Sequence, residues 1–233
     1  MRQEMSERVM DKYSLIIFDW DGTLVDSISS IVKALRQAAV EERLPVLDDV
    51  LYRGVVGLSL APAMEHLYPA LSANEVERLC RAYKKHHLVL EEEPSRPFVG
   101  VLEGLPALRD SKILLAVATG KRRSGLQRSM IANDVEAFFD ASLTADDARS
   151  KPDPDMIEQL MKRFQLMPEQ ILMVGDSGFD MEMACRAGVD RLAVTYGAGS
   201  REDLERYQPV FIADDFDGVL VWLGVKPVLE QVV

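Results

Sequence analysis

Two aspartates that directly follow a short apolar run near the N-terminus constrain the fold more than any other feature of this chain. The run at residues 15–18, LIIF, has no polar alternation, which is typical of a central strand in a parallel sheet covered on both faces. Asp19 and Asp21 come next, and their two-residue spacing on an extended backbone points both side chains the same way. Gly22 then allows an immediate turn. Because such sheets bind ligands at the carboxyl ends of their strands, the two carboxylates predict a site for chemistry.

A second pair of carboxylates follows another apolar run. Residues 171–174 are apolar, and Asp176 and Asp180 come after them, four residues apart near the start of an expected helix. Helix capping by Asp176 or Ser177 is an ordinary structural explanation for this segment taken alone.

Two further segments carry polar groups of a different kind. An expected strand at residues 113–118 ends in Thr119 and Gly120, and Lys151 stands before Pro152 in a loop that the proline restricts. Each segment is weak by itself, as is the Asp-Gly dipeptide at residue 21, which is also common in turns.

Taken together and in this order, residues 19–23, Thr119, Lys151 and residues 176–180 resemble the four signature motifs of the haloacid dehalogenase-like hydrolase superfamily. The resemblance covers nearly the whole chain. Within the superfamily the chain is most similar to the phosphoglycolate phosphatase-like group, through residues 24–27 (LVDS) and 57–60 (GLSL). One departure is Gly120, where relatives often carry asparagine, which leaves a backbone N–H rather than a side chain to contact phosphate there.

The resemblance implies a magnesium-dependent phosphatase that hydrolyses a small phosphate monoester, similar to phosphoglycolate or a sugar phosphate, through an aspartyl-phosphate intermediate. Asp19 is then the nucleophile and Asp21 the acid/base, which suits a phosphoryl transfer in which carboxylates and a hard cation handle the charge. The implied phosphate-binding residues are Thr119, Gly120 and Lys151, and the implied Mg²⁺ ligands are Asp19, Asp21 through its backbone carbonyl, Asp176 and Asp180.

The order of strand and helix patterns predicts the fold class. From residue 113 onward strands and helices alternate, which indicates an α/β fold with a Rossmann-like, doubly wound parallel sheet core. Residues 29–93 instead read as successive helices, the first with apolar periodicity at Ile31 and Leu35. We therefore predict an inserted α-helical cap domain at residues 25–97, over a catalytic core made of residues 1–24 and 98–233.

The net charge and the cysteine content limit which partners and which compartment we expect for this protein. A net charge of −11 argues against binding nucleic acid or an anionic membrane, and it makes a metal ion and a local cation necessary for an anionic substrate. Cys80 and Cys185 lack metal-ligand spacing, so we expect two small buried hydrophobic side chains in a reducing compartment. Residues 1–12 resemble neither a signal peptide nor a membrane anchor. We expect a cytoplasmic protein that acts on a small phosphorylated metabolite, and the sequence leaves its oligomeric state open.

Several residues have two interpretations. The sequence favours neither of two positions for Lys121, inside the site or outside it. Arg122 and Arg123 are expected at the edge of the site, without contact to the substrate. In the cap, Arg53 and residues 57–59 are candidates to contact the leaving group, with the alternative that residues 55–58 are an apolar turn of the cap core. We interpret residues 91–93 as a solvated acidic face, and the three histidines, His66, His86 and His87, as surface or packing residues.

Other chemistries on the same scaffold are less well supported. A haloacid dehalogenase would not need Asp21, and the cap lysines Lys33, Lys84 and Lys85 do not stand in the setting of a phosphonatase Schiff base. A sugar phosphomutase remains an alternative, although Thr23 is more typical of the phosphatases. A non-catalytic binding module is disfavoured because all four acidic residues are intact.

Overall fold

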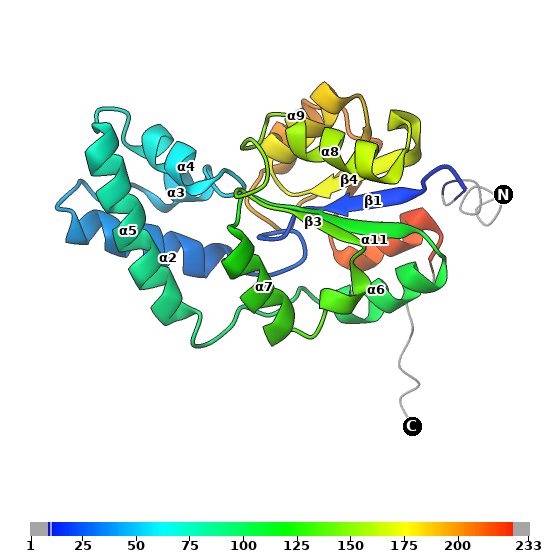
Figure 1. The fold of residues 1–233 in the computed structure, drawn as a ribbon, viewed down its shortest axis with the longest axis horizontal. Helices are drawn as coiled ribbons and strands as arrows, with labels where there is room; N and C mark the ends of the chain where they lie inside the picture. Colours follow the sequence, from blue (N-terminus) through cyan, green and yellow to red (C-terminus); the bar gives the residue numbers. More distant parts are fainter. Residues whose placement is uncertain (1–8, 10, 226–233) are drawn as a thin grey trace.

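A six-stranded parallel sheet forms the centre of the computed structural model, which describes residue 9 and residues 11–225 (Figure 1). The strand order is β3-β2-β1-β4-β5-β6, the arrangement of a doubly wound fold, so the predicted fold class is confirmed. β1 is central and pairs in parallel with β2 and β4. The strands are β1 (Leu15–Phe18), β2 (Leu114–Ala118), β3 (Ala141–Leu143), β4 (Ile171–Gly175), β5 (Asp190–Val194) and β6 (Phe211–Ala213).

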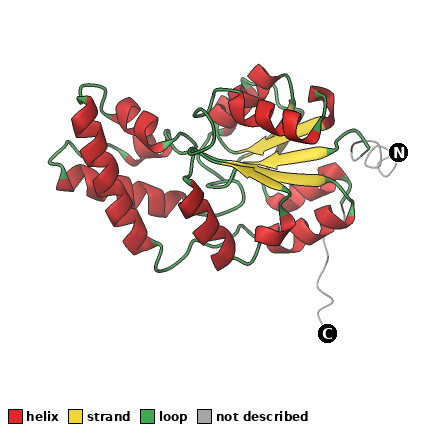
Figure 2. Cartoon of the chain, in the orientation of Figure 1, coloured by secondary structure: helices red, strands yellow, loops and turns green. Residues whose placement is uncertain are grey.

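Helices cover both faces of this sheet (Figure 2). Alternate residues of β1 face opposite sides, so that Ile16 and Phe18 enter one hydrophobic cluster while Leu15 and Ile17 enter another. The first cluster includes side chains of α6 (Val101–Asp110), α7 (Arg123–Ala132) and α11 (Phe216–Leu223). The second includes side chains of α8 (Asp155–Phe164) and α9 (Gly178–Ala187), with α10 (Arg201–Glu205) packed nearby against β5.

The helices after β1 form a separate body with its own hydrophobic cluster, at the left of Figure 1. These are α2 (Ile28–Glu41), α3 (Asp49–Arg53), α4 (Leu60–Leu67) and α5 (Ala73–Leu90). The periodic residues Ile31 and Leu35 lie on the buried face of α2. We call this body the cap and keep residues 25–97 as its proposed boundaries. The outer ends of the proposed core, including most of residues 1–12, lie outside the described residues.

The sequence patterns did not predict two of the helices, α6 and α10. α6 contains Gly104 and Pro106, both unfavourable inside a helix, and so gives no clear helical signal. Its packing explains it: a Cβ on Gly104 would lie 2.6 Å from a ring carbon of Phe216, so α6 and α11 approach closely. The short α10 is likewise stabilised by tertiary contact, through Leu204.

The structure corrects the prediction that both cysteines are buried. Cys80 is buried as expected, but Cys185 is exposed, so the prediction was wrong for Cys185.

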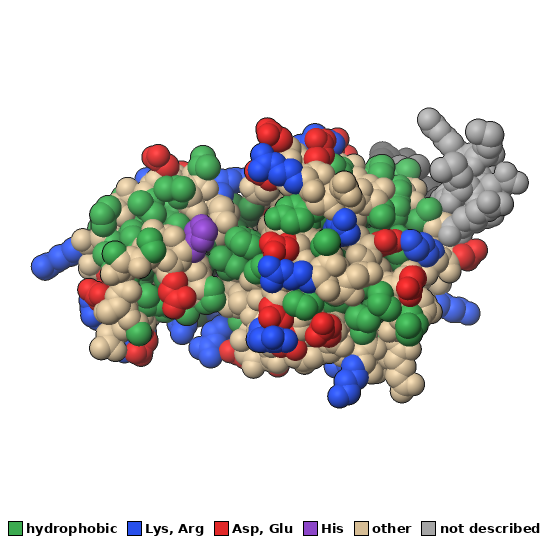
Figure 3. All heavy atoms as spheres, turned by 90° about the horizontal axis from the view of Figure 1, so that it is seen from above, with side chains coloured by type: hydrophobic (Ala, Val, Ile, Leu, Met, Phe, Trp, Pro, Cys, Tyr) green, Lys and Arg blue, Asp and Glu red, His purple; other side chains and the backbone are tan. Residues whose placement is uncertain are grey.

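Over the described residues, no helix has both the length and the apolar character to cross a membrane. Basic and acidic side chains lie next to each other on the face of the core seen in Figure 3. Surface ion pairs such as Arg149–Asp153 form on the core.

Candidate active site

Asp19 lies directly after β1 and is almost fully buried. Its backbone N–H still donates to the carbonyl of Val174, at 3.0 Å, and the residue is only 1% exposed. Within the described residues neither carboxylate oxygen accepts a well-oriented hydrogen bond, although the Lys151 ammonium is within ion-pair distance, 2.7 Å from Oδ1. Burial raises the pKa of Asp19 well above its usual value; Lys151 opposes this rise, and the carboxylates of Asp180 and Asp176 add to it. A further cation beside this carboxylate would favour its ionised form.

Asp176 and Asp180 meet Asp19 at this edge of the sheet. Asp176 follows β4 and accepts a hydrogen bond from the Thr23 hydroxyl at 2.9 Å. Asp180 lies in the first turn of α9, where one oxygen accepts from the backbone N–H and the hydroxyl of Ser177, at 3.0 and 2.6 Å. Helix capping therefore does occur here, but it also fixes the orientation of Asp180. One oxygen from each of the three carboxylates lies within 4.8 Å of the others.

This cluster of three buried carboxylates fits a hard divalent cation. Carboxylate oxygens are the ligands that Mg²⁺ prefers, and the unsatisfied oxygens of Asp19 would gain a partner. Burial, followed by the charge of Asp180, raises the pKa of Asp176. Asp19, Asp176 and Asp180 would hold the metal. Magnesium as its identity, and the contact through the Asp21 carbonyl, stay predictions.

Lys151 lies behind the carboxylates and is buried completely. Its ammonium donates to Asp180 Oδ1 at 2.6 Å as well as contacting Asp19. Burial by itself lowers the pKa of Lys151, but the charges of Asp180 and Asp19 outweigh it and raise the pKa, so the lysine stays charged. Lys151 is absent from the wall of the cavity described below. Its predicted contact with phosphate stays a prediction, whereas its contact with the nucleophile candidate is direct.

The Asp21 side chain lies outside the carboxylate cluster and has a cation of its own. The Lys121 ammonium donates to both of its oxygens, at 2.7 and 2.9 Å, and the Ser27 hydroxyl donates at 2.6 Å. Burial alone would raise the pKa of Asp21, but Lys121 and Ser27 lower it below the usual range. Gly22, at φ +87°, permits this turn, and a Cβ there would lie 2.3 Å from Asp176. Of the two interpretations of Lys121, the structure supports the one inside the site.

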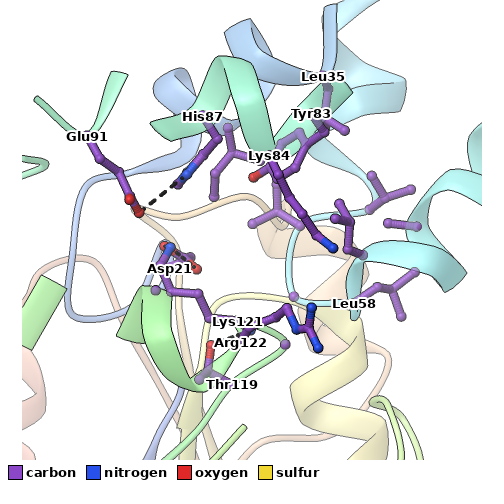
Figure 4. A pocket seen from close by; sticks show the side chains of 18 of the residues that line it. Asp21, Leu35, Leu58, Tyr83, Lys84, His87, Glu91, Thr119, Lys121 and Arg122 are labelled. Atoms are coloured by element: carbon purple, nitrogen blue, oxygen red, sulfur yellow. Dashed lines mark hydrogen bonds and ion pairs between the residues drawn. The ribbon is translucent and has the colours of Figure 1, made fainter. Parts of the chain in front are cut away.

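A cavity of about 280 Å³ lies between the core and the cap (Figure 4). Asp19, Asp21, Thr119 and Gly120 line its core end, and Thr119 is held in place because its backbone N–H donates to the carbonyl of Leu143. The catalytic and two of the phosphate-binding residues predicted from the sequence therefore open onto one space.

The cap end of the cavity includes residues that the sequence analysis missed. Tyr83, His87 and Glu91 lie on one face of α5 and its C-terminal end, and all three border the cavity (Figure 4). His87 Nδ1 is 3.3 Å from Glu91, which also binds the Arg128 guanidinium of α7 at 2.6 Å. The interpretation of Glu91 as solvated was therefore wrong, whereas His87 does pack, against Tyr83, and in addition borders the cavity. Their four-residue spacing, which places side chains on one helix face, was the signal available in the sequence.

The other cap candidates divide into two groups. Gly57 and Leu58 border the cavity. Arg53 and Ser59 instead join the cap to the core: Arg53 donates to the Gly197 carbonyl at 3.0 Å, and the Ser59 N–H donates to the Ser150 hydroxyl at 2.9 Å.

The two arginines after Lys121 have acidic partners near the rim. Arg122 pairs with Asp146, and Arg123 pairs with Asp147. Arg122 also borders the cavity, whereas Arg123 is absent from its wall.

Gly120 controls how closely the cap approaches the core, which gives a first test. A Cβ at this position would lie 2.5 Å from the carbonyl oxygen of Leu58 and 2.6 Å from that of Gly57. We expect Gly120→Ala to keep its backbone N–H yet hold the cap away, lowering kcat/KM by about 10- to 100-fold because small misplacements of reacting groups are costly. The measurement is kcat/KM of both proteins for hydrolysis of the same phosphate ester. The control is Gly125→Ala, which would meet only ordinary contacts and should cost far less; equal effects of the two changes would contradict the closure argument.

Comparison with known proteins gives consistent similarities. Residues 16–194 match the family model described as haloacid dehalogenase-like hydrolase. The chain is 35% identical over 212 residues to a probable phosphatase named IndB from Dickeya dadantii, which covers 88% of this chain and 91% of that protein. It is 28% identical to a phosphoglycolate phosphatase from Mesorhizobium japonicum, over 91% of this chain and 95% of that one. A solved structure described as a predicted phosphoglycolate phosphatase from Haemophilus somnus has a TM-score of 0.81 at 28% identity, covering 89% and 96% of the two chains.

Proposed function

The chain belongs to the haloacid dehalogenase-like hydrolase family, and we propose that it is a magnesium-dependent phosphatase that hydrolyses a small phosphate monoester through an aspartyl-phosphate. The observation that carries this proposal is the arrangement of Asp19 and Asp21 on one cavity, each with a different partner. Asp19 lies among carboxylates with Lys151, and Asp21 is held by Lys121 and Ser27. Two carboxylates in different surroundings suit two different roles.

In the first step the Asp19 carboxylate attacks phosphorus and the bond to the ester oxygen breaks, so that the phosphoryl group becomes attached to Asp19. Asp21 donates to the departing alkoxide the proton that it took from water in the second step of the preceding turnover. Thr119 and Gly120 border the same end of the cavity, and the hydroxyl of the first and the backbone N–H of the second bind the phosphoryl oxygens in this proposal. Asp19, Asp176 and Asp180 would hold the Mg²⁺, which would neutralise charge on the phosphate and the carboxylates.

In the second step Asp21 accepts a proton from water, which attacks phosphorus and releases inorganic phosphate with Asp19 restored. The ion pair with Lys121 favours the ionised form of Asp21, which is the form that accepts this proton. We also propose a cytoplasmic location, which is supported by two cysteines that carry free thiols.

The proposed function is tested by assaying the purified protein on a panel of phosphate esters with Mg²⁺ and with a chelator. We expect release of inorganic phosphate that requires the divalent ion. Isomerisation of a sugar phosphate faster than phosphate release would instead support a phosphomutase, and no turnover of any ester would reject both.

Lys151→Ala should damage both turnover and stability. Removing one preorganised charged donor costs about 100- to 1000-fold in turnover, or about 2.7–4 kcal/mol. The change also leaves Asp19 and Asp180 buried without their cation, which costs about 3–5 kcal/mol of unfolding free energy. Kinetics and urea unfolding, with and without Mg²⁺, measure the two effects, and added Mg²⁺ should recover part of the stability.

The exposed Lys162 of α8 provides a control, since Lys162→Ala should change neither quantity. Thr119→Ala should cost less turnover than Lys151→Ala, because a hydroxyl offers one neutral hydrogen bond. A nearly silent Lys151→Ala would mean that the phosphate-binding lysine lies on another loop, with Lys121 the next candidate.

A further inference from the structure

The cavity has two ends of different chemistry. Its core end carries the polar groups that the proposed phosphoryl transfer uses. Its cap end is walled by aliphatic side chains from three segments of the cap, namely Ile31, Leu35, Val55, Val56, Leu58 and Leu60. A leaving group attached to a phosphate bound at Asp19 would therefore extend into a mainly apolar space.

One side of the cap end is aromatic. The rings of Tyr83 and His87 are stacked, with centroids 5.2 Å apart and an interplanar angle of 28°, and both border the cavity (Figure 4). Because Glu91 lies 3.3 Å from Nδ1 of His87, the orientation of the imidazole is restrained. The pair forms an aromatic wall on which a planar ring could pack.

The basic side chains around the cavity offer little to an anionic leaving group. Three of them already have acidic partners: Lys121 with Asp21, Arg122 with Asp146 and Arg128 with Glu91. Lys84 is the cavity-lining lysine without an ion-pair partner among the described residues, and it is exposed to solvent. A carboxylate or phosphate in the cap end would lose water and gain only this exposed lysine, whose charge solvent screens.

The size of the cavity favours a leaving group larger than a two-carbon acid. A space of about 280 Å³ is larger than a phosphoryl group and two carbons would fill, so such a substrate would leave part of the aliphatic wall without contact. The aliphatic wall would then remain hydrated, which is unfavourable.

We propose that this enzyme acts on a phosphate monoester whose leaving alcohol is uncharged and carries a ring with a large apolar face, which packs between the aliphatic wall and the Tyr83–His87 pair. This inference rests on the proposed phosphatase function and adds the class of leaving group. Phosphoglycolate and pyrophosphate, whose leaving groups are small and anionic, become poor substrates.

The test compares 2-phenylethyl phosphate with ethyl phosphate, phosphoglycolate and pyrophosphate, all with Mg²⁺. The first two have alcohols of similar basicity, so their kcat/KM ratio reports the contact with the ring. We expect 2-phenylethyl phosphate to exceed each of the others by at least about tenfold, since each apolar group in a fitted pocket contributes that order of discrimination. Leu58→Gln should lower the ratio of 2-phenylethyl to ethyl phosphate.

The control is Leu102→Gln, at an exposed leucine outside the cavity, which should leave the ratio unchanged. Hydrolysis of all four compounds without preference, or a preference for phosphoglycolate, would overturn the inference while leaving the proposed function standing. An equal loss on both esters in Leu58→Gln would also overturn it. Absence of hydrolysis of all four compounds by a protein that does release phosphate from the ester panel described above would overturn the inference, whereas inactivity on the whole panel would reject the proposed function.

Discussion

The Asp19→Asn variant is expected to release no more inorganic phosphate from an aryl phosphate than a reaction without enzyme. An amide keeps the size of the side chain but cannot attack phosphorus, and it removes one of three carboxylates that we assign to the metal. The change also deletes a buried negative charge beside Lys151, which retains Asp180 as its partner. The measurement is phosphate release with Mg²⁺, together with acid quenching and mass spectrometry of the protein.

Only the unmutated protein should yield a phosphorylated Asp19 peptide. Asp134→Asn is a suitable control, because Asp134 is exposed and at φ +55°, a conformation that asparagine accepts readily. Substantial turnover by Asp19→Asn would exclude the covalent mechanism, whereas loss of activity in the control would point to a general defect of the preparation.

Asp21→Asn is expected to bind Mg²⁺ and substrate almost normally but to turn over about 10²- to 10⁴-fold more slowly, the range of a lost general acid–base. Its carboxylate lies outside the metal cluster, so the cluster keeps its three acidic side chains. The Ser27 hydroxyl and Lys121 lose a charged acceptor, but the amide oxygen can still accept a hydrogen bond. Calorimetric titration of Mg²⁺ and steady-state kinetics separate these effects.

Ser27→Ala is the matched control for Asp21, because it removes a single hydrogen bond to the same carboxylate while leaving the charge. Ser27→Ala should lower the free energy of unfolding by about 0.5–1.5 kcal/mol. It should slow turnover far less than Asp21→Asn does. A collapse of Mg²⁺ affinity in Asp21→Asn with little change in turnover would assign this side chain to the metal instead of to proton transfer.

The fold class followed from local patterns. The apolar runs before Asp19, Thr119 and Asp176 give three of the strands, and the carboxyl ends of parallel strands meet at one edge of the sheet. Strands that are buried on both faces must be apolar along their length, so they appear in the sequence as uninterrupted apolar runs. α6 was missed because its helical form depends on contact with α11 rather than on its own residues.

The sequence by itself therefore determined the α/β core, its helical insert and the set of carboxylates that meet at the end of the central strand. Only the tertiary structure decided that Lys121 pairs with Asp21 across 100 residues, that Gly120 meets the carbonyls of the cap, and that His87 faces the cavity. The reason is physical. Strand and helix patterns reflect the solvent that each segment faces, whereas contacts between cap and core depend on how two separately packed bodies rest against each other, which many weak contacts distant in sequence decide together.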